Sequence, residues 1–178
     1  AHAHGIAHRD IAPNNIIVCD TPTGRRIRLI DFGIAVIRSY YENSPQRAPT
    51  QSGMVAYSAR YPSPEQVLCH RTGSWTDVHA LGLILHHLLT GQLPYPDGAQ
   101  NPERGACSLR RPTPGLVGVD VGAWEIVLSQ AVSLDPAARQ RTAQQLLDDL
   151  QRTLTDAVPG KQNLREALPE GWRLVELS

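Results

Sequence analysis

Apolar residues recur at helical spacing in three stretches of the chain. The first stretch begins near Thr76 and ends at Gly91, and its leucines repeat every three or four residues, which predicts a buried helix. A second helix is predicted from about residue 121 to 133, before Asp135 and its following proline. A third begins with a capping-box pattern at Thr142 and continues with leucines to residue 154. These stretches predict a mainly helical core.

Two short β-branched runs precede the helices. Residues 16–18 and 27–30 are rich in isoleucine and valine, and the segment between them has the composition of a hairpin turn. We therefore expect a small two-stranded ribbon. The first five residues are typical of the last turn of a helix. Residues 31–61 and 94–114 lack a sustained period and predict loops, the second with at most one short helix.

The composition narrows the class of protein. The 178 residues contain 17 basic and 17 acidic side chains, so no net charge favours unspecific binding to nucleic acids or membranes. The three cysteines form no CxxC pair, which favours a reducing compartment and predicts a cytoplasmic location. The most apolar stretch, 81–89, is too short to cross a bilayer. Lys161 is the only lysine, and its position excludes a Walker A loop.

Three oxygen-bearing side chains are placed around the predicted ribbon. Asn15 follows Asp10 by five residues, both before the first strand, and Asp31 comes directly after the second strand. This order brings the three side chains to one end of the ribbon. Carboxylate and amide oxygens, together with phosphate oxygens and water, are the ligands that Mg²⁺ prefers. The pattern therefore predicts a site for magnesium and a phosphate.

The same residues belong to a series of five motifs along the chain. These are His8-Arg9-Asp10-Ile11-Ala12-Pro13-Asn14-Asn15, Asp31-Phe32-Gly33, Ser63-Pro64-Glu65, Trp75-Thr76-Asp77-Val78 and Asp135-Pro136-Ala137-Ala138-Arg139. Together they resemble the C-terminal lobe of a protein kinase, whose HRDxxxxN and DFG motifs serve phosphoryl transfer. The resemblance implies a mainly α (α+β) fold, in which the ribbon carries the catalytic and DFG loops. It also implies a partial kinase domain at 1–154 and a tail at 155–178, a short helix or a linker.

The resemblance implies a role at the active site for five matched residues. Asp10 would accept the proton of the substrate hydroxyl. Asn15 and Asp31 would hold Mg²⁺ on the phosphates of ATP. Ile17 and Ile30 would lie beneath the adenine. ATP and Mg²⁺ are thus the implied cofactors.

Five further residues have implied structural or regulatory roles. Arg9 would pair with a phosphorylated activation loop, because an arginine beside the catalytic aspartate can order such a loop. The hydroxyl of Ser58 would form a hydrogen bond near the catalytic aspartate. Glu65 and Arg139 would form a buried ion pair. Asp77 would hold the backbone of the catalytic loop.

The implied reaction is transfer of the γ-phosphoryl group of ATP to a Ser or Thr hydroxyl of a protein. Pro13 and residues 57–61 resemble those of Ser/Thr kinases, and residues 57–91 resemble bacterial members. The sequence contains no counterpart of the N-terminal lobe, with its Gly-rich loop and its Lys and Glu pair. That lobe is therefore an implied partner, and we expect little turnover by this chain alone.

Two other functions stay open. Ala12 stands where the family usually has a lysine that touches the transferred phosphate, and one such lost charge costs on the order of 2.7–4 kcal/mol. A non-catalytic pseudokinase or truncated interaction module would fit this change. A small-molecule kinase of the aminoglycoside phosphotransferase type also shares an Asp and Asn loop. A metal site at His4 and His8 or at His86 and His87 is disfavoured, because the cysteines supply no ligand pairs.

Overall fold

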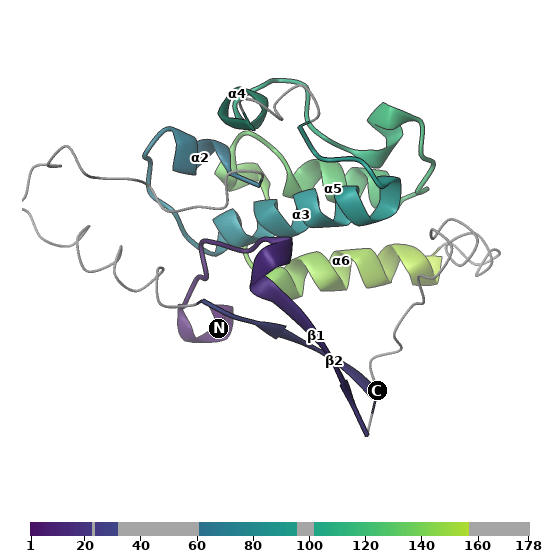
Figure 1. The fold of residues 1–178 in the computed structure, drawn as a ribbon. Coiled ribbons are helices and arrows are strands. Elements are labelled where there is room, and N and C mark those ends of the chain that lie inside the picture. The colour runs from purple at the N-terminus through teal and green to yellow at the C-terminus, as the bar shows by residue number, and fades with distance from the viewer. Residues whose placement is uncertain (23, 32–60, 96–101, 157–178) are drawn as a thin grey trace, which may run out of the picture.

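The fold is a body of helices from which a two-stranded ribbon projects (Figure 1). It is taken from a computed structural model that describes residues 1–22, 24–31, 61–95 and 102–156. In chain order the elements, with η for 3₁₀ helices, are η1 (His2–His4), η2 (Pro13–Asn15), β1 (Ile16–Thr21), β2 (Gly24–Leu29), α2 (Pro64–Val67), α3 (Ser74–Thr90), α4 (Pro102–Ala106), η4 (Pro114–Val117), α5 (Trp124–Ala131), η5 (Pro136–Ala138) and α6 (Ala143–Asp156). The prediction of a mainly helical fold with a small ribbon is confirmed.

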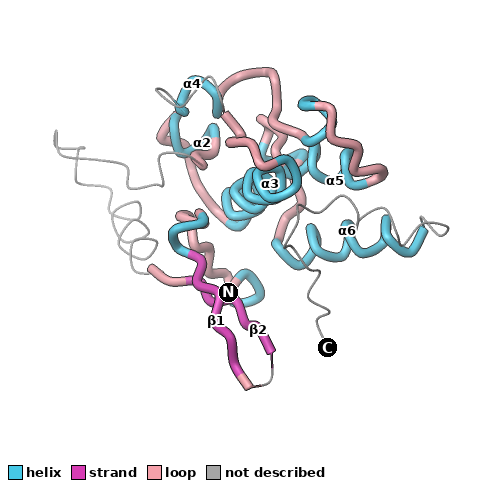
Figure 2. Tube along the Cα trace, turned by 45° about the vertical axis from the view of Figure 1, so that its right-hand side comes forward, coloured by secondary structure: helices cyan, strands magenta, loops and turns pink. Residues whose placement is uncertain are grey.

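Helix α3 lies at the centre of the helical body, as its apolar pattern predicts. It packs against α5, α6 and η4, and Figure 2 shows it between α2, α5 and α6. The helix ends where predicted, because Gly91 adopts a left-handed φ of 69° and donates its N–H to the His87 carbonyl. Gly82 allows close packing, since a Cβ at this position would lie 2.8 Å from a Val132 methyl carbon.

The core has two neighbouring parts on either side of α3. One part joins α3 to the segment after η1 and to α4, and it contains Ile11, Ala12, Tyr61, Ala80, Leu83, Ile84, Tyr95, Ala106 and Val132. The other joins α3 to α5 and α6, and it contains Val78, Leu89, Val127, Leu128, Ala131, Leu146 and Leu150. Each fully buried aliphatic side chain contributes about 1.5–3 kcal/mol to folding. The core therefore fixes α3 relative to the residues around Asp10.

Two helices differ from their predicted bounds. Helix α5 is shorter than the predicted 121–133, because Gly122 adopts a φ of 56° and donates its N–H to Asp120 Oδ1, which forms a turn before Trp124. Helix α6 begins after Thr142, whose hydroxyl accepts the N–H of Gln145. It continues to Asp156, two residues past the predicted domain boundary at 154. The short helix α2 was not predicted, because four residues are too few for an apolar period.

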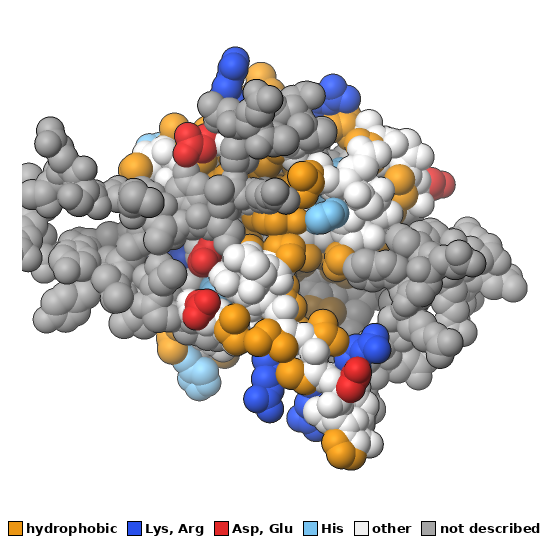
Figure 3. All heavy atoms as spheres, viewed as in Figure 1, with side chains coloured by type: hydrophobic (Ala, Val, Ile, Leu, Met, Phe, Trp, Pro, Cys, Tyr) orange, Lys and Arg blue, Asp and Glu red, His pale blue; other side chains and the backbone are white. Residues whose placement is uncertain are grey.

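The ribbon is antiparallel, with Val18 opposite Ile27 and Ile16 opposite Leu29. Both strands extend further toward the turn than the predicted runs. Val18 is 56% exposed and Ile27 70% exposed, so one face of the ribbon presents apolar side chains to solvent. In the space-filling view, hydrophobic side chains follow the ribbon between arginines (Figure 3). Among the described residues, no helix has the length and apolar character that crossing a membrane requires.

Candidate functional site

A buried carboxylate in α3 fixes the backbone that precedes Asp10. Asp77, only 1% exposed, accepts the N–H of His8 at 2.7 Å through Oδ2 and the N–H of Arg9 at 2.6 Å through Oδ1. Hydrogen bonds to a charged acceptor are stronger than neutral ones, at about 1.5–3 kcal/mol each. Asp77 therefore holds the backbone of the His8–Asp10 segment, as the sequence predicts.

Arg9 adopts a left-handed backbone conformation, with φ of 67°. Such a conformation costs a non-glycine residue on the order of 1–3 kcal/mol and persists only where the surroundings impose it. Here both neighbouring peptide groups are held, since Asp77 accepts the Arg9 N–H and Gln66 Nε2 donates to the Arg9 carbonyl at 2.7 Å. Gln66 in turn belongs to the capping box of α2 with Ser63. Helix α2 is thereby connected to the backbone next to Asp10.

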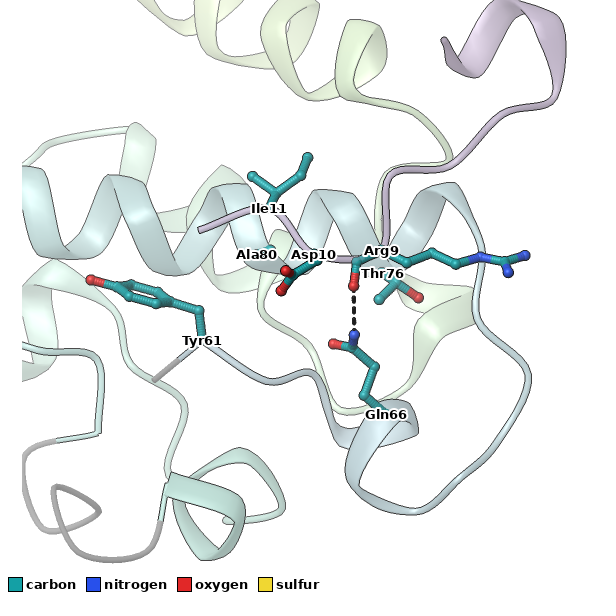
Figure 4. A pocket seen from close by; sticks show the side chains of 7 residues that line it. All are labelled: Arg9, Asp10, Ile11, Tyr61, Gln66, Thr76 and Ala80. Carbon is teal, nitrogen blue, oxygen red and sulfur yellow. Dashed lines mark hydrogen bonds between the residues drawn. The ribbon is translucent and has the colours of Figure 1, made fainter. Parts of the chain in front are cut away.

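The strained backbone separates the side chains of Arg9 and Asp10 (Figure 4). The Arg9 guanidinium points away from the Asp10 carboxylate, and Tyr61 lies on the opposite side of the picture from Arg9. A small pocket beside Asp10 is lined by Arg9, Asp10, Ile11, Tyr61, Gln66, Thr76 and Ala80. The side chain of Asp10 is thus accessible from a pocket formed by α2, α3 and the segment before η2.

His8 connects this segment to the end of the ribbon. Its ring is buried, Nε2 lies 2.9 Å from the Ile30 carbonyl, and Nδ1 accepts the N–H of Asp10 at 3.3 Å. A carbonyl only accepts, so the tautomer with its proton on Nε2 satisfies both contacts. This contact places the Ile30 carbonyl, and therefore the next residue, Asp31, beside the Asp10 segment.

Asn15 lies against Asp10. Its Nδ2 donates to the Asp10 carboxylate at 2.9 Å and to the Asp10 carbonyl at 2.7 Å. Its backbone carbonyl accepts the N–H of Ile30 at 3.0 Å, across the base of the ribbon. The sequence prediction that Asp10 and Asn15 meet at one end of the ribbon therefore agrees with the hydrogen bonds.

Asp31 follows Ile30 at the same end of the ribbon. It is exposed and adopts a left-handed φ of 64°. The amide oxygen of Asn15 and the carboxylate of Asp31 are the donor types that suit Mg²⁺, which needs only one or two protein carboxylates beside phosphate oxygens and water. The residues present thus fit the ion in kind. Within the described ranges, no group of three or more His, Cys, Asp or Glu side chains is arranged so that it could hold a metal ion.

The two residues predicted to contact the adenine lie near the base of the ribbon. Ile17 belongs to β1 and pairs with Arg28, and Ile30 follows the last residue of β2 and donates its N–H to the Asn15 carbonyl. Ile17 is 43% exposed, which leaves apolar area for a flat ligand. The predicted residue Ser58 and the Phe32-Gly33 pair of the DFG motif lie outside the described residues.

Glu65 and Arg139 form the buried ion pair that the sequence predicts. The guanidinium donates from Nη1 to Oε1 at 2.8 Å and from Nη2 to Oε2 at 3.0 Å, and the two side chains are 3% and 0% exposed. Thr76 also donates to Glu65, at 2.9 Å, and Arg139 Nε donates to the Ser133 carbonyl. The pair connects α2 and α3 to the segment between α5 and α6. It supports the site without touching Asp10.

Sequence reasoning missed His2. Its Nε2 lies 2.7 Å from Asp77 Oδ2, and its Nδ1 accepts the N–H of Ala143 at 3.0 Å. One imidazole therefore contacts the carboxylate that holds the Asp10 segment and also accepts an N–H from the first turn of α6. The partners are 75 and 141 residues away in sequence. No local pattern around His2 indicates either contact.

A second buried histidine was also missed. His79 in α3 is fully buried, and its Nε2 accepts from Arg111 Nη2 at 2.7 Å. Arg111 also donates to the carbonyls of Val132 and Ala106. Because a guanidinium has no lone pair to offer, the ring is neutral with its proton on Nδ1. Burial, followed by the charges of Arg139 and Arg111, lowers the pKa of His79 well below its ordinary value of 6.5.

This histidine predicts a loss of stability in acid. The unfolded chain binds a proton at this residue below about pH 6.5, whereas the folded chain does not until its much lower pKa is reached. Below about pH 6.5 the free energy of unfolding therefore decreases as the pH is lowered. This group contributes up to about 1.4 kcal/mol of that decrease per pH unit. His79→Gln keeps an acceptor for Arg111 and should flatten the slope in urea titrations between about pH 6.5 and 5. The exposed His4→Gln serves as the control, and equal slopes in the two variants would contradict the assignment.

The remaining histidines and cysteines form no metal site within the residues that the structure describes. His4 is exposed, whereas both ring nitrogens of His8 form hydrogen bonds, to the Ile30 carbonyl and the Asp10 N–H. These two histidines therefore do not converge on a metal. His86 is buried, and burial lowers its pKa. Cys19, Cys69 and Cys107 are free thiols.

Comparisons with known proteins agree with this architecture. The family model described as protein kinase domain matches residues 1–152. The chain is 32% identical over 179 residues to the serine/threonine-protein kinase Pkn1 of Myxococcus xanthus, which covers 99% of this chain and 25% of Pkn1. It is 42% identical over 101 residues to PknA of Mycobacterium tuberculosis, which covers 56% of this chain and 21% of PknA. The chain thus spans about a quarter of the length of these relatives.

A solved structure shows the same fold. The kinase domain of Mycobacterium tuberculosis PknI is similar with a TM-score of 0.58 and 26% identity, over 85% of this chain and 48% of that one. This likeness agrees with the match of the family model over most of the sequence. The chain belongs to the protein kinase family.

Proposed function

We propose that this chain carries the catalytic and magnesium-binding residues of a Ser/Thr protein kinase. The reaction is transfer of the γ-phosphoryl group of ATP to a Ser or Thr hydroxyl of a protein, with Mg²⁺ as the cofactor. The observation that carries the proposal is the contact of the Asn15 amide with the Asp10 carboxylate, on a backbone that Asp77 holds. The named relatives are Ser/Thr kinases, which supports the same reaction.

Positioning and charge provide the catalysis in this proposal. Asp10 accepts the proton of the substrate hydroxyl, and its hydrogen bond from Asn15 fixes the orientation of the carboxylate. Asn15 and Asp31 hold Mg²⁺, which when bound neutralises charge on the phosphates. Ile17 and Ile30 lie beneath the adenine. The contacts of Asn15 with Asp10 and with the Ile30 N–H, at the base of the ribbon, support these roles.

The proposal includes regulation and a partner lobe. Arg9 pairs with a phosphorylated activation loop, which its direction away from Asp10 permits (Figure 4). In this proposal the hydroxyl of Ser58 forms a hydrogen bond near Asp10. The kinase lobe comprises residues 1–154, with 155–178 as a tail. An N-terminal lobe covers the ATP, and without it we expect little turnover. The three free thiols favour a cytoplasmic location.

One observation favours a second candidate, a non-catalytic interaction module. Ala12 is fully buried in the core cluster and brings no positive charge to the transferred phosphate. In the family that position usually supplies a lysine, and its loss lowers the rate without removing the residues that bind magnesium. A chain with this change can keep its fold and bind another protein without catalysing phosphoryl transfer.

Phosphoamino acid analysis separates these functions. The chain is joined to the N-terminal lobe of a bacterial Ser/Thr kinase and incubated with Mg-ATP, a generic protein substrate and an aminoglycoside. We expect phosphoserine or phosphothreonine in the protein and an unmodified aminoglycoside. Phosphate on the aminoglycoside would instead identify a small-molecule kinase. No transfer to either acceptor would support the interaction module.

A further inference from the structure

The side-chain amide of Gln66 contacts two different parts of the chain. Its Oε1 accepts the N–H and the hydroxyl of Ser63, each at 3.0 Å. Its Nε2 donates to the Arg9 carbonyl at 2.7 Å, the contact that the dashed line in Figure 4 marks. Gln66 is only 3% exposed and lines the pocket beside Asp10. One buried amide thus joins the cap of α2 to the backbone next to Asp10.

The cap of α2 does not require a glutamine. A capping box accepts either Glu or Gln at this position, because the N-cap N–H needs only a side-chain oxygen as its acceptor. A glutamate carboxylate would lack the N–H donor that Gln66 directs at the Arg9 carbonyl. The nitrogen of this amide therefore serves the backbone next to Asp10, and its oxygen serves the helix.

The contact holds the peptide group that joins Arg9 to Asp10. Asp77 binds the N–H groups of His8 and Arg9, which precede this peptide group. The carbonyl of the peptide group accepts from Gln66 at 2.7 Å. Its N–H, which belongs to Asp10, donates to His8 Nδ1 at the longer distance of 3.3 Å. Gln66 therefore forms the shorter of these two hydrogen bonds to the peptide group from which Asp10 extends.

We propose that Gln66 is a positioning residue, which holds the peptide group between Arg9 and Asp10 and thereby directs the Asp10 carboxylate toward the substrate hydroxyl. The inference rests on the proposed function, because it takes Asp10 as the catalytic base. Without the N–H of Gln66, this peptide group can rotate about ψ of Arg9 and φ of Asp10 while the contacts of Asp77 persist. A displacement of about 1 Å at a catalytic group can reduce a rate by about 100-fold.

Gln66→Glu tests the role of this single N–H donor. The variant keeps an oxygen that accepts from Ser63 and removes the donor to Arg9. In the chain joined to the N-terminal lobe of a bacterial Ser/Thr kinase, we expect kcat to fall by about 100-fold while KM for ATP stays the same. Gln145→Glu is the matched control and should keep the parent rate, because Gln145 is exposed and uses its oxygen to accept the Arg141 N–H.

Carbonyl NMR of the chain itself reports the contact without any transfer reaction. A hydrogen bond to a carbonyl oxygen moves the ¹³C signal downfield, so the Arg9 signal should move upfield in Gln66→Glu and stay in place in Gln145→Glu. Ser63→Ala removes the capping hydroxyl but keeps the N–H of Gln66. It should therefore leave both the Arg9 signal and the rate close to those of the parent. If Gln66 served only the cap of α2, Ser63→Ala and Gln66→Glu would lower the rate alike.

Gln66→Met gives the same test without a new charge, where circular dichroism shows that Gln66→Glu does not fold. It also lacks the N–H and should show the same upfield shift and the same loss of rate. An active parent with an equally active Gln66 variant, an unchanged Arg9 signal, or equal losses in Ser63→Ala and Gln66→Glu would overturn the inference. An inactive parent whose Arg9 signal still responds to Gln66→Glu would instead contradict the proposed function.

Discussion

Arg139→Ala should lower the free energy of unfolding by about 3–5 kcal/mol. The substitution leaves the Glu65 carboxylate, 3% exposed, without its bidentate partner, while the Thr76 hydroxyl still donates to it. An uncompensated buried charge has no access to water, so the cost exceeds that of the lost contacts alone. Urea unfolding at neutral pH, followed by the far-ultraviolet circular dichroism of the helices, measures the change.

A surface ion pair provides the matched control. Arg152 donates to Asp149 at 2.7 Å, but the arginine side chain is 68% exposed. Arg152→Ala should therefore cost only about 0.2–1 kcal/mol. Replacing both buried partners, in Glu65→Leu with Arg139→Met, should cost less than Arg139→Ala because no charge stays unpaired. Similar losses for Arg139→Ala and Arg152→Ala would show that the buried pair does not stabilise this lobe.

Asp77→Ala should release the backbone around Asp10. Three groups, the N–H of His8, the N–H of Arg9 and His2 Nε2, would lose their shared acceptor. Each buried donor left without a partner costs about 1–3 kcal/mol. Of the two contacts that hold the φ of Arg9 at 67°, only that of Gln66 with the Arg9 carbonyl would remain. We expect amide hydrogen exchange at His8 and Arg9 to accelerate about 100-fold or more, equivalent to about 2.7 kcal/mol of lost protection.

The same variant should impair any transfer reaction. A displacement of about 1 Å at a catalytic group can reduce a rate by about 100-fold, and Asp10 directly follows the released backbone. Asp148→Ala on the exposed face of α6 controls for removal of a carboxylate. Unchanged exchange at His8 and Arg9 in Asp77→Ala would contradict the role of Asp77, whatever the change in overall stability.

The sequence predicts the parts of the molecule that rest on local patterns. The end of α3 at Gly91 and the start of α6 after Thr142 follow from a left-handed glycine and a capping hydroxyl. In α6 the capping box is only half formed, because the Gln145 side chain accepts from the Arg141 N–H. For α2 the signal was present in Ser63 and Gln66, a Ser-x-x-Gln box, but the segment was interpreted only through its family motif.

Contacts between distant segments could not be predicted in the same way. His2 bonds to Asp77 and Ala143, and His79 to Arg111, through tertiary packing that leaves no periodic trace in the sequence. The ion pair of Glu65 and Arg139 was predicted only because both residues lie in motifs of a known family. The contact of the Tyr61 hydroxyl with His87 Nδ1 has no such motif to indicate it. Side chains that connect elements far apart therefore need the fold before they can be found.

The rate of phosphate transfer by Asp10→Asn tests the central claim most directly. The chain joined to a kinase N-terminal lobe is assayed with radiolabelled Mg-ATP and a protein substrate, beside the exposed control Asp148→Asn. A positioned general base contributes about 10²–10⁴-fold, so Asp10→Asn should lose activity by that factor while the control keeps the full rate. A rate unchanged by Asp10→Asn, with the same phosphorylated residues, would contradict the assignment of Asp10 as the catalytic base.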